Sequence, residues 1–126
     1  MSVLLAAALL TAGLFSSPAQ ELPPATAAEV ERLLGLLGNS ECRFNRNGTW
    51  YSGQDAQAHL RNKYEYLVKK GLIRTAEDFI EGAGEKSSLS GQPYTVQCGT
   101  QDAAFSGTWL RERLVEIRRA RHGTKP

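Results

Sequence analysis

The stretch Cys42–Gly53, C-R-F-N-R-N-G-T-W-Y-S-G, predicts a β-hairpin. Its turn is the Asn-Gly pair at positions 47–48, because a two-residue type I′ turn needs a positive φ at both central residues and these residue types adopt it most easily. The pairing that follows sets Phe44 opposite Tyr51, and strand alternation places both on one face with the first cysteine. We expect that face to be turned toward the core.

The opposite face of the hairpin carries Arg43, Asn45 and Trp50. An exposed tryptophan beside an arginine has two explanations, and both stay open. The guanidinium can pack on the indole ring as a cation–π pair. The indole can also be a contact point for a partner, a role in which tryptophan is enriched.

The two cysteines of the chain, Cys42 and Cys98, are expected to form one disulfide, as is usual for a small exported protein. They stand 56 positions apart, and the chain-entropy treatment of such a loop gives about 4 kcal/mol of stabilisation. No C-x-x-C motif is present, so thiol exchange is not indicated. Two cysteines and two histidines lack the spacing of a zinc site, and we expect no metal or cofactor.

Residues 1–19 are typical of an export signal, with an apolar run followed by small residues before Gln20. The first residues lack the usual positive charge, but the apolar run is too short to span a bilayer comfortably. We expect an extended leader over 20–25, a single α+β domain over 26–122 and a tail over 123–126. The mature protein would then be exported, with no integral membrane segment.

Four helices are expected, and residue types that favour helix ends mark their limits. An apolar stripe at helical spacing follows the first start signal. The start signals are Thr26 with Glu29 as a capping box, Ser52 with Asp55 in the first turn, Thr75 with Asp78, and Ser106 or Thr108; Gly38-Asn39 and Gly71 mark ends.

Tyr94–Cys98 predicts a third strand, and Ala103–Phe105 is considered as a brief edge strand. The order of elements is helix, strand, strand, helix, helix, strand, helix. That order predicts an α+β fold: a small three-stranded antiparallel sheet, made of the hairpin plus one strand, with about four helices on one face. The disulfide would place the first strand at the centre.

The formal net charge of +2 is too small to indicate nucleic-acid binding. Basic residues nevertheless crowd the last helix and the tail. One interpretation is a solvated helix face with a frayed end; the other is contact with anionic envelope polymers or lipid head groups. The residues concerned are Arg111, Arg113, Arg118, Arg119, Arg121 and Lys125.

Several motifs together resemble the YfeK-like family of small exported bacterial proteins, a domain of unknown function. The resemblance covers about residues 30–117 and implies an exported, periplasmic protein of Gram-negative bacteria, with no known activity. Its first half is C-R-F-N-R-N-G at 42–48 with Tyr51, A-H-L at 58–60 and Lys63; its second half is T-A at 75–76, F-I at 79–80, S-S at 87–88 and S-G-Q-P-Y at 90–94.

Polar residues of these motifs form the candidate ligand-binding set. A functional interpretation makes them one anion-accepting patch, in which arginine is a two-pronged donor, lysine a point charge and the serine loop a nest of N–H groups. A structural interpretation gives the asparagine to the turn and the serines to their own backbone. The set is Arg46, Asn47, His59, Lys63, Ser87, Ser88, Ser90, Gly91 and Tyr94.

His59 lies four positions from both Asp55 and Lys63, so the three residues form a row on one helix flank. The histidine is then either a surface residue bonded to Asp55 or a ligand contact. The first functional hypothesis is a non-enzymatic binding module of the cell envelope. Its partner would be an unidentified envelope protein, peptide or polymer.

Two alternatives use the serine-rich loop. The loop Ser90-Gly91-Gln92-Pro93-Tyr94 is similar to the short loop with which exported lysozyme inhibitors plug the enzyme cleft. A small serine hydrolase would instead need one of the loop serines to react with the help of His59 and Asp55. No G-x-S-x-G motif is present, and no convincing catalytic set emerges.

Overall fold

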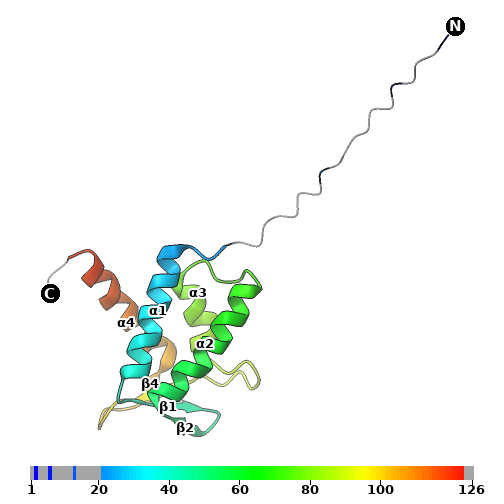
Figure 1. Cartoon of the computed structure of the whole chain (residues 1–126). Coiled ribbons are helices and arrows are strands. Elements are labelled where there is room, and N and C mark those ends of the chain that lie inside the picture. The colour runs from blue at the N-terminus through cyan, green and yellow to red at the C-terminus, as the bar shows by residue number, and fades with distance from the viewer. Residues whose placement is uncertain (1, 3–5, 7–12, 14–20, 124–126) are drawn as a thin grey trace.

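The structure, a computed structural model, describes residues 21–123 together with Ser2, Ala6 and Gly13 (Figure 1). The predicted export signal, apart from those three positions, and Lys125 lie outside the described residues. The fold class is α+β, as predicted. In chain order the elements are α1 (Pro24–Asn39), β1 (Arg43–Arg46), β2 (Thr49–Tyr51), α2 (Gly53–Lys69), α3 (Ala76–Phe79), the π-helical turn η1 (Ile80–Gly84), β3 (Thr95–Gln97), β4 (Ala104–Phe105) and α4 (Ser106–Arg121).

The sheet has four antiparallel strands in the order β2-β1-β3-β4, so the prediction of three strands is wrong. The additional strand, β4, pairs Thr95 with Phe105 and lies within Ala103–Phe105, the segment considered as a brief edge strand. The hairpin is as predicted, with Phe44 opposite Tyr51 and β1 between two partners. Its turn has positive φ at both central residues, 51° at Asn47 and 85° at Gly48.

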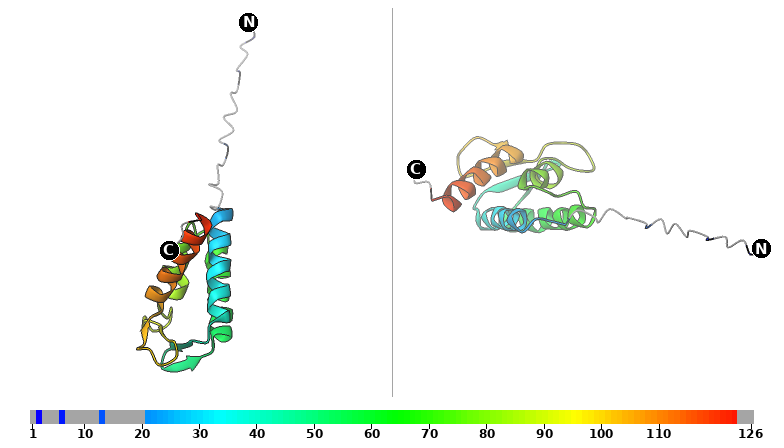
Figure 2. Two further views of the ribbon diagram at one scale, coloured as in Figure 1. Left: turned by 90° about the vertical axis from the view of Figure 1, so that its left-hand side faces the viewer. Right: turned by 90° about the horizontal axis from the view of Figure 1, so that it is seen from above.

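The helices lie on one side of the sheet, which forms one end of the molecule (Figures 1 and 2). α1 lies beside α2, and α3, η1 and α4 complete the layer (Figure 2). The predicted apolar stripes meet in one core between these elements. Its buried members include Val30, Leu33, Leu34, Leu37, Phe44, Leu60, Tyr64, Phe79, Ile80, Ala83, Trp109, Leu110, Leu114 and Ile117.

Cys42 and Cys98 form the predicted disulfide. The bond joins the start of β1 to the end of β3, two strands that also pair antiparallel. The outer face of β1 carries Arg43, whose guanidinium carbon lies 5.5 Å from the centre of the Trp50 ring. The cation–π arrangement of the sequence analysis is therefore present, while a partner for Trp50 remains a hypothesis.

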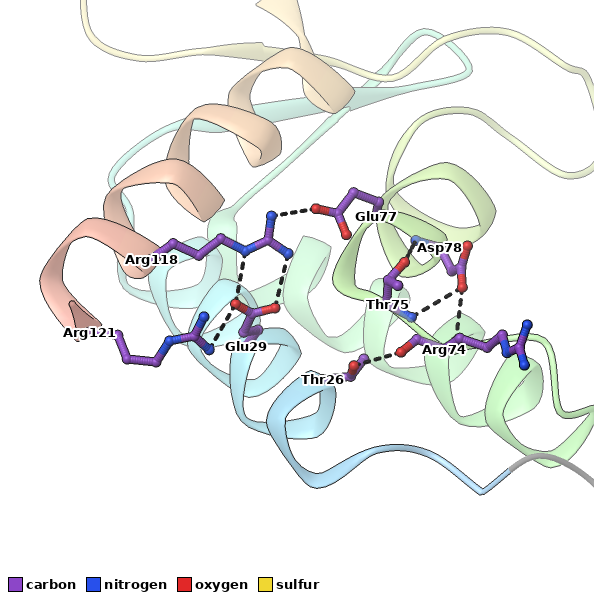
Figure 3. Close-up of polar contacts among 8 residues, drawn as sticks. All are labelled: Thr26, Glu29, Arg74, Thr75, Glu77, Asp78, Arg118 and Arg121. Atoms are coloured by element: carbon purple, nitrogen blue, oxygen red, sulfur yellow. Dashed lines mark hydrogen bonds and ion pairs between the residues drawn. The ribbon is translucent and has the colours of Figure 1, made fainter.

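The start of α1 differs from the prediction. The helix begins at Pro24, where the missing N–H of proline costs no hydrogen bond, and not at Thr26. The Thr26 hydroxyl instead donates to the Arg74 carbonyl at 2.7 Å (Figure 3). The Glu29 carboxylate forms an ion pair with Arg118 at 3.0 Å, so the predicted capping box does not form.

The end of α1 lies at Asn39 as predicted, but Gly38 is not the left-handed residue that such an end usually carries. A Cβ on Gly38 would lie 2.6 Å from the Gln57 side chain, so the close approach of α2 explains this glycine. Helix α4 also starts without the predicted hydroxyl cap. Phe105 occupies the N-cap position, because β4 runs straight into the helix, and the Ser106 N–H donates to the Tyr94 carbonyl at 2.9 Å.

The remaining helix ends confirm the predictions. Ser52 caps α2 by accepting from the Asp55 N–H at 3.1 Å, and Gly71 follows α2 with a φ of 69°. Thr75 and Asp78 form a complete capping box at α3. Among the described residues, no helix combines the length and the apolar character that a membrane span requires.

The arginines of α4 are largely engaged in ion pairs. Arg118 contacts Glu29 and Glu77, and Arg121 contacts Glu29 at 3.2 Å, so α4 is tied to α1 and α3 (Figure 3). Arg111 pairs with Glu85 at 2.7 Å. A fully solvated basic face is therefore not what the described part of α4 presents. Contact of this helix with anionic polymers or lipids stays a prediction.

Candidate functional site

Residues from three elements meet beside the hairpin. Arg46 closes β1 on the same strand face as Phe44, so its side chain is turned to the helical layer. His59 and Lys63 lie one turn apart on α2, which starts directly after the hairpin. Tyr94, buried at the entrance to β3, completes a group that we call the basic network: Arg46, His59, Lys63 and Tyr94.

Hydrogen bonds connect the whole basic network. The Nη1 atom of Arg46 lies 2.7 Å from Nδ1 and 3.1 Å from Nε2 of the His59 ring. His59 Nε2 lies 3.1 Å from the Tyr94 hydroxyl, and Lys63 Nζ donates to the same hydroxyl at 3.3 Å. Four residues that the sequence marked as candidates thus converge in space.

The partners of His59 determine its protonation. A guanidinium can only donate, so His59 accepts at Nδ1, the closer nitrogen, and carries its hydrogen on Nε2, which donates to Tyr94. Burial, followed by the charges of Arg46 and Lys63, lowers the pKa of His59 below its ordinary 6.5. The histidine is therefore neutral at pH 7, and the predicted bond to Asp55 is replaced by bonds to Arg46 and Tyr94.

The two cations of the network are held close to aromatic rings. The guanidinium carbon of Arg46 lies 4.9 Å from the centre of the Tyr51 ring, and Lys63 Nζ lies 5.2 Å from that of Tyr94. Burial and the nearby Arg46 lower the pKa of Lys63. Burial raises the pKa of the Tyr94 phenol, with the Arg46 charge acting in the opposite direction.

Within the described residues, neither Arg46 nor Lys63 has a carboxylate within ion-pair distance of 4.0 Å. Other arginines of the chain are neutralised by glutamates. These are Arg61, Arg111, Arg113, Arg118 and Arg121. The basic network is thus a partly buried positive site that the protein itself leaves without a counter-charge in contact.

A cavity of about 150 Å³ adjoins this network. Its wall combines apolar side chains, the ring of Tyr51 and polar groups, with one carboxylate, that of the exposed Asp55. Lys63 is not among the residues of this wall. The lining residues are Phe44, Asn45, Arg46, Tyr51, Asp55, Ala56, His59, Leu60, Tyr94 and Ser106.

The serine loop forms a separate cluster with the hairpin turn. The Asn47 amide donates to Ser87 Oγ at 3.2 Å and accepts from Ser90 Oγ at 2.6 Å. Gly91 has a φ of 72°, and Ser88 is exposed. The candidate set is therefore split into the basic network and this loop cluster of Asn47, Ser87, Ser90 and Gly91.

The backbone of the loop is engaged within the loop. The N–H groups of Leu89 and Ser90 donate to Ser87 Oγ, and that of Gly91 donates to the Ser87 carbonyl. The Gln92 N–H donates to Ser90 Oγ. These four N–H groups do not form an open nest, so the positive character of the site comes from the basic network.

Sequence reasoning missed Tyr51 and Ser106 as site residues. Tyr51 could have been found, because its register opposite Phe44 places it on the face that also carries Arg46. Ser106 gives no such signal. It reaches the cavity only because β4 pairs with β3, a contact between segments that no local pattern indicates.

Comparisons with known proteins agree with these motifs. The chain is similar to the uncharacterized protein YfeK of Salmonella typhimurium, with 34% identity over 68 residues. The match covers 53% of this chain and 55% of YfeK, so the chain spans about half the length of this curated relative. No solved structure matches. Residues 24–118 match the Family of unknown function (DUF5329), and the chain belongs to this family, as its resemblance to YfeK-like proteins predicted.

Proposed function

We propose that this protein is a non-enzymatic binding module of the cell envelope, exported to the periplasm, whose basic network receives an anionic group of a polymer, peptide or partner protein. The observation that supports it is the pair of half-buried cations, Arg46 and Lys63, without a carboxylate in contact among the described residues. Partly buried charges that lack an opposite charge are costly, and a bound anion would relieve this cost.

The electrostatics of His59 and Lys63 support the same proposal. The pKa of each is lowered by burial and by the charge of Arg46. An anion beside Arg46 opposes both effects, because an opposite charge favours the protonated form. Binding would therefore be coupled to proton uptake by His59.

The geometry offers less support for the hydrolase alternative. Ser87 Oγ accepts hydrogen bonds from two loop amides and from Asn47, and Ser90 Oγ is bonded to Asn47. His59 bonds to Arg46 and Tyr94. Nucleophilic serine chemistry needs a hydrogen bond between serine and base, and these residues direct their bonds elsewhere.

The test is an NMR titration of the His59 ring with acetate and with sulfate. We expect its pKa to rise on addition of either anion, because bound negative charge favours the imidazolium. The double variant Arg46→Gln/Lys63→Gln should lose the response, whereas Arg43→Gln/Lys69→Gln removes the same charge elsewhere and should keep it. An unchanged His59 titration in the wild type would contradict the proposal.

A second test uses envelope extract. Immobilised protein should capture anionic material that the Arg46→Ala/Lys63→Ala variant does not retain. Identical capture by the two proteins would exclude the basic network as the binding surface.

A second candidate function, an inhibitor that plugs an enzyme cleft such as that of lysozyme, is favoured by a different observation. Leu89 is 97% exposed at the tip of the serine loop, whose backbone is held by internal hydrogen bonds. Tyr94 is buried and bonded to His59, so Leu89 rather than Tyr94 would enter the cleft. In a lysozyme clearing assay, excess protein should slow lysis and Leu89→Ser should not; undiminished lysis excludes this function.

A further inference from the structure

The cavity beside the basic network restricts the kind of anion that fits. Its apolar wall includes Phe44, Ala56 and Leu60, and its volume is about 150 Å³. A dry apolar cavity of that size can hold benzene. A purely ionic ligand would leave this wall in contact with water, so the cavity favours a ligand with an apolar part.

Ser106 adds a polar group to the same cavity. The residue is only 2% exposed and lines the cavity. Ser106 is also the first helical residue of α4, whose N-cap residue Phe105 supplies no side-chain bond. The hydroxyl of a serine in the cavity wall can donate a hydrogen bond, and the first turn of α4 has no side-chain cap, so both features favour a hydrogen-bond acceptor with negative charge nearby.

Asp55 limits the charge of the ligand. Its carboxylate belongs to the cavity wall, on the first turn of α2. This group would repel a doubly charged phosphate more strongly than a single carboxylate, so the cavity favours one negative charge. The wall therefore combines the Arg46 guanidinium, the Ser106 hydroxyl and the Asp55 carboxylate with apolar side chains.

We infer that this cavity takes a monocarboxylate that carries a compact apolar group, a phenyl ring or a branched alkyl chain, with the carboxylate held by Arg46 and Ser106. This inference rests on the proposed function, since it specifies the anion that the basic network receives. Such a group occurs in free acids and at the C-terminus of peptides that end in an apolar residue.

The experiment compares matched probes by NMR titration of the wild-type protein. The probes are 3-phenylpropanoate, propanoate, which lacks the ring, and 3-phenylpropanamide, which lacks the charge. We expect 3-phenylpropanoate to bind about tenfold or more tightly than either, because burial of an aromatic group and pairing of the charge each contribute. A diglycyl-phenylalanine peptide and its C-terminal amide then distinguish the peptide source from the free acid.

The outcomes separate this inference from the proposed function. Equal affinity for propanoate and 3-phenylpropanoate overturns the inference and leaves an anion site in place. Equal affinity for 3-phenylpropanoate and its amide overturns the role of the carboxylate. Absence of binding by every carboxylate, together with an unchanged His59 titration, overturns both.

Two variants test the location. Ala56→Leu fills the cavity and should bring the ratio of the 3-phenylpropanoate and propanoate affinities close to one, whereas Ala58→Leu, on the exposed side of the same helix, should preserve the ratio. Ser106→Ala should weaken both carboxylates and not the amide. If either cavity variant is poorly folded, the probe series on the wild type still decides the matter.

Discussion

His59 contributes to stability with a definite dependence on pH. Its pKa in the folded protein is lowered by burial and by Arg46 and Lys63. In the unfolded chain the histidine becomes protonated near its ordinary pKa of about 6.5, whereas in the folded protein it does so only at a lower pH. The unfolded state then binds more protons below about pH 6.5, and the free energy of unfolding falls as the pH is lowered from there toward the folded pKa.

We predict that His59→Gln reduces this fall below about pH 6.5, because glutamine keeps hydrogen-bonding groups and does not titrate. Urea unfolding at several pH values measures it. His122→Gln, at the exposed end of α4, is the matched control and should retain the wild-type slope. Parallel slopes for the wild type and His59→Gln would contradict the prediction.

Glu29 is the second residue with a large expected effect. Its side chain is only 9% exposed and receives Arg118 and Arg121 from α4, while Arg118 also contacts Glu77 on α3 (Figure 3). Removal of one partner from a buried ion pair leaves charges without compensation. Arg118 is 38% exposed, so water screens part of this effect.

We predict that Glu29→Gln lowers the free energy of unfolding by about 1–3 kcal/mol. The control is Glu31→Gln, because Glu31 pairs with Arg61 but is 52% exposed, and it should change stability by about 0.5 kcal/mol or less. Chemical denaturation compares the two variants. A similar loss of unfolding free energy in both variants would show that the burial of Glu29 does not strengthen its ion pairs.

At the junction of the hairpin and α2, one glycine is required for packing. A Cβ on Gly53 would collide with the Leu37 carbonyl and lie 2.9 Å from that of Ser40. Both are backbone atoms at the end of α1, and backbone atoms cannot rotate away. The contact therefore determines how closely α2 can start beside α1.

We predict that Gly53→Ala destabilises the protein by about 1–3 kcal/mol, as overpacking does. Gly35→Ala in α1 should instead stabilise it by about 1 kcal/mol, since nothing lies within 4 Å of a Cβ there and alanine is the better helix former. Thermal unfolding of the two variants provides the measurement. A stabilised Gly53→Ala variant would refute the collision.

For the molecule as a whole, the disulfide is the strongest single constraint on the unfolded chain. It closes a loop between residues 56 positions apart and joins the two inner strands of the sheet. We predict that Cys42→Ser/Cys98→Ser lowers the free energy of unfolding by up to about 4 kcal/mol. A reductant should destabilise the wild type similarly and leave the double variant unchanged. Equal stability of the wild type with and without reductant would contradict this.

Two motifs with the same spacing show a limit of prediction from the sequence, because only one of them forms the expected helix cap. Thr75-x-x-Asp78 and Thr26-x-x-Glu29 both have the spacing of a capping box, and only the first forms one. In the second, Pro24 starts the helix earlier, and tertiary partners on α4 and before α3 engage the two side chains. A side chain with several possible partners binds the one that packing brings near.

Most features that the amino-acid sequence predicted correctly depend on residues a few positions apart. The disulfide is the exception, and it could be predicted because the chain has only two cysteines. The correctly predicted features are the Asn-Gly turn and its register, the caps of α2 and α3, the apolar stripes and the pairing of the two cysteines. The partners of Glu29 and the cavity with Ser106 arose only in the folded chain. Each joins segments distant in sequence, and such contacts depend on the packing of all the elements between them.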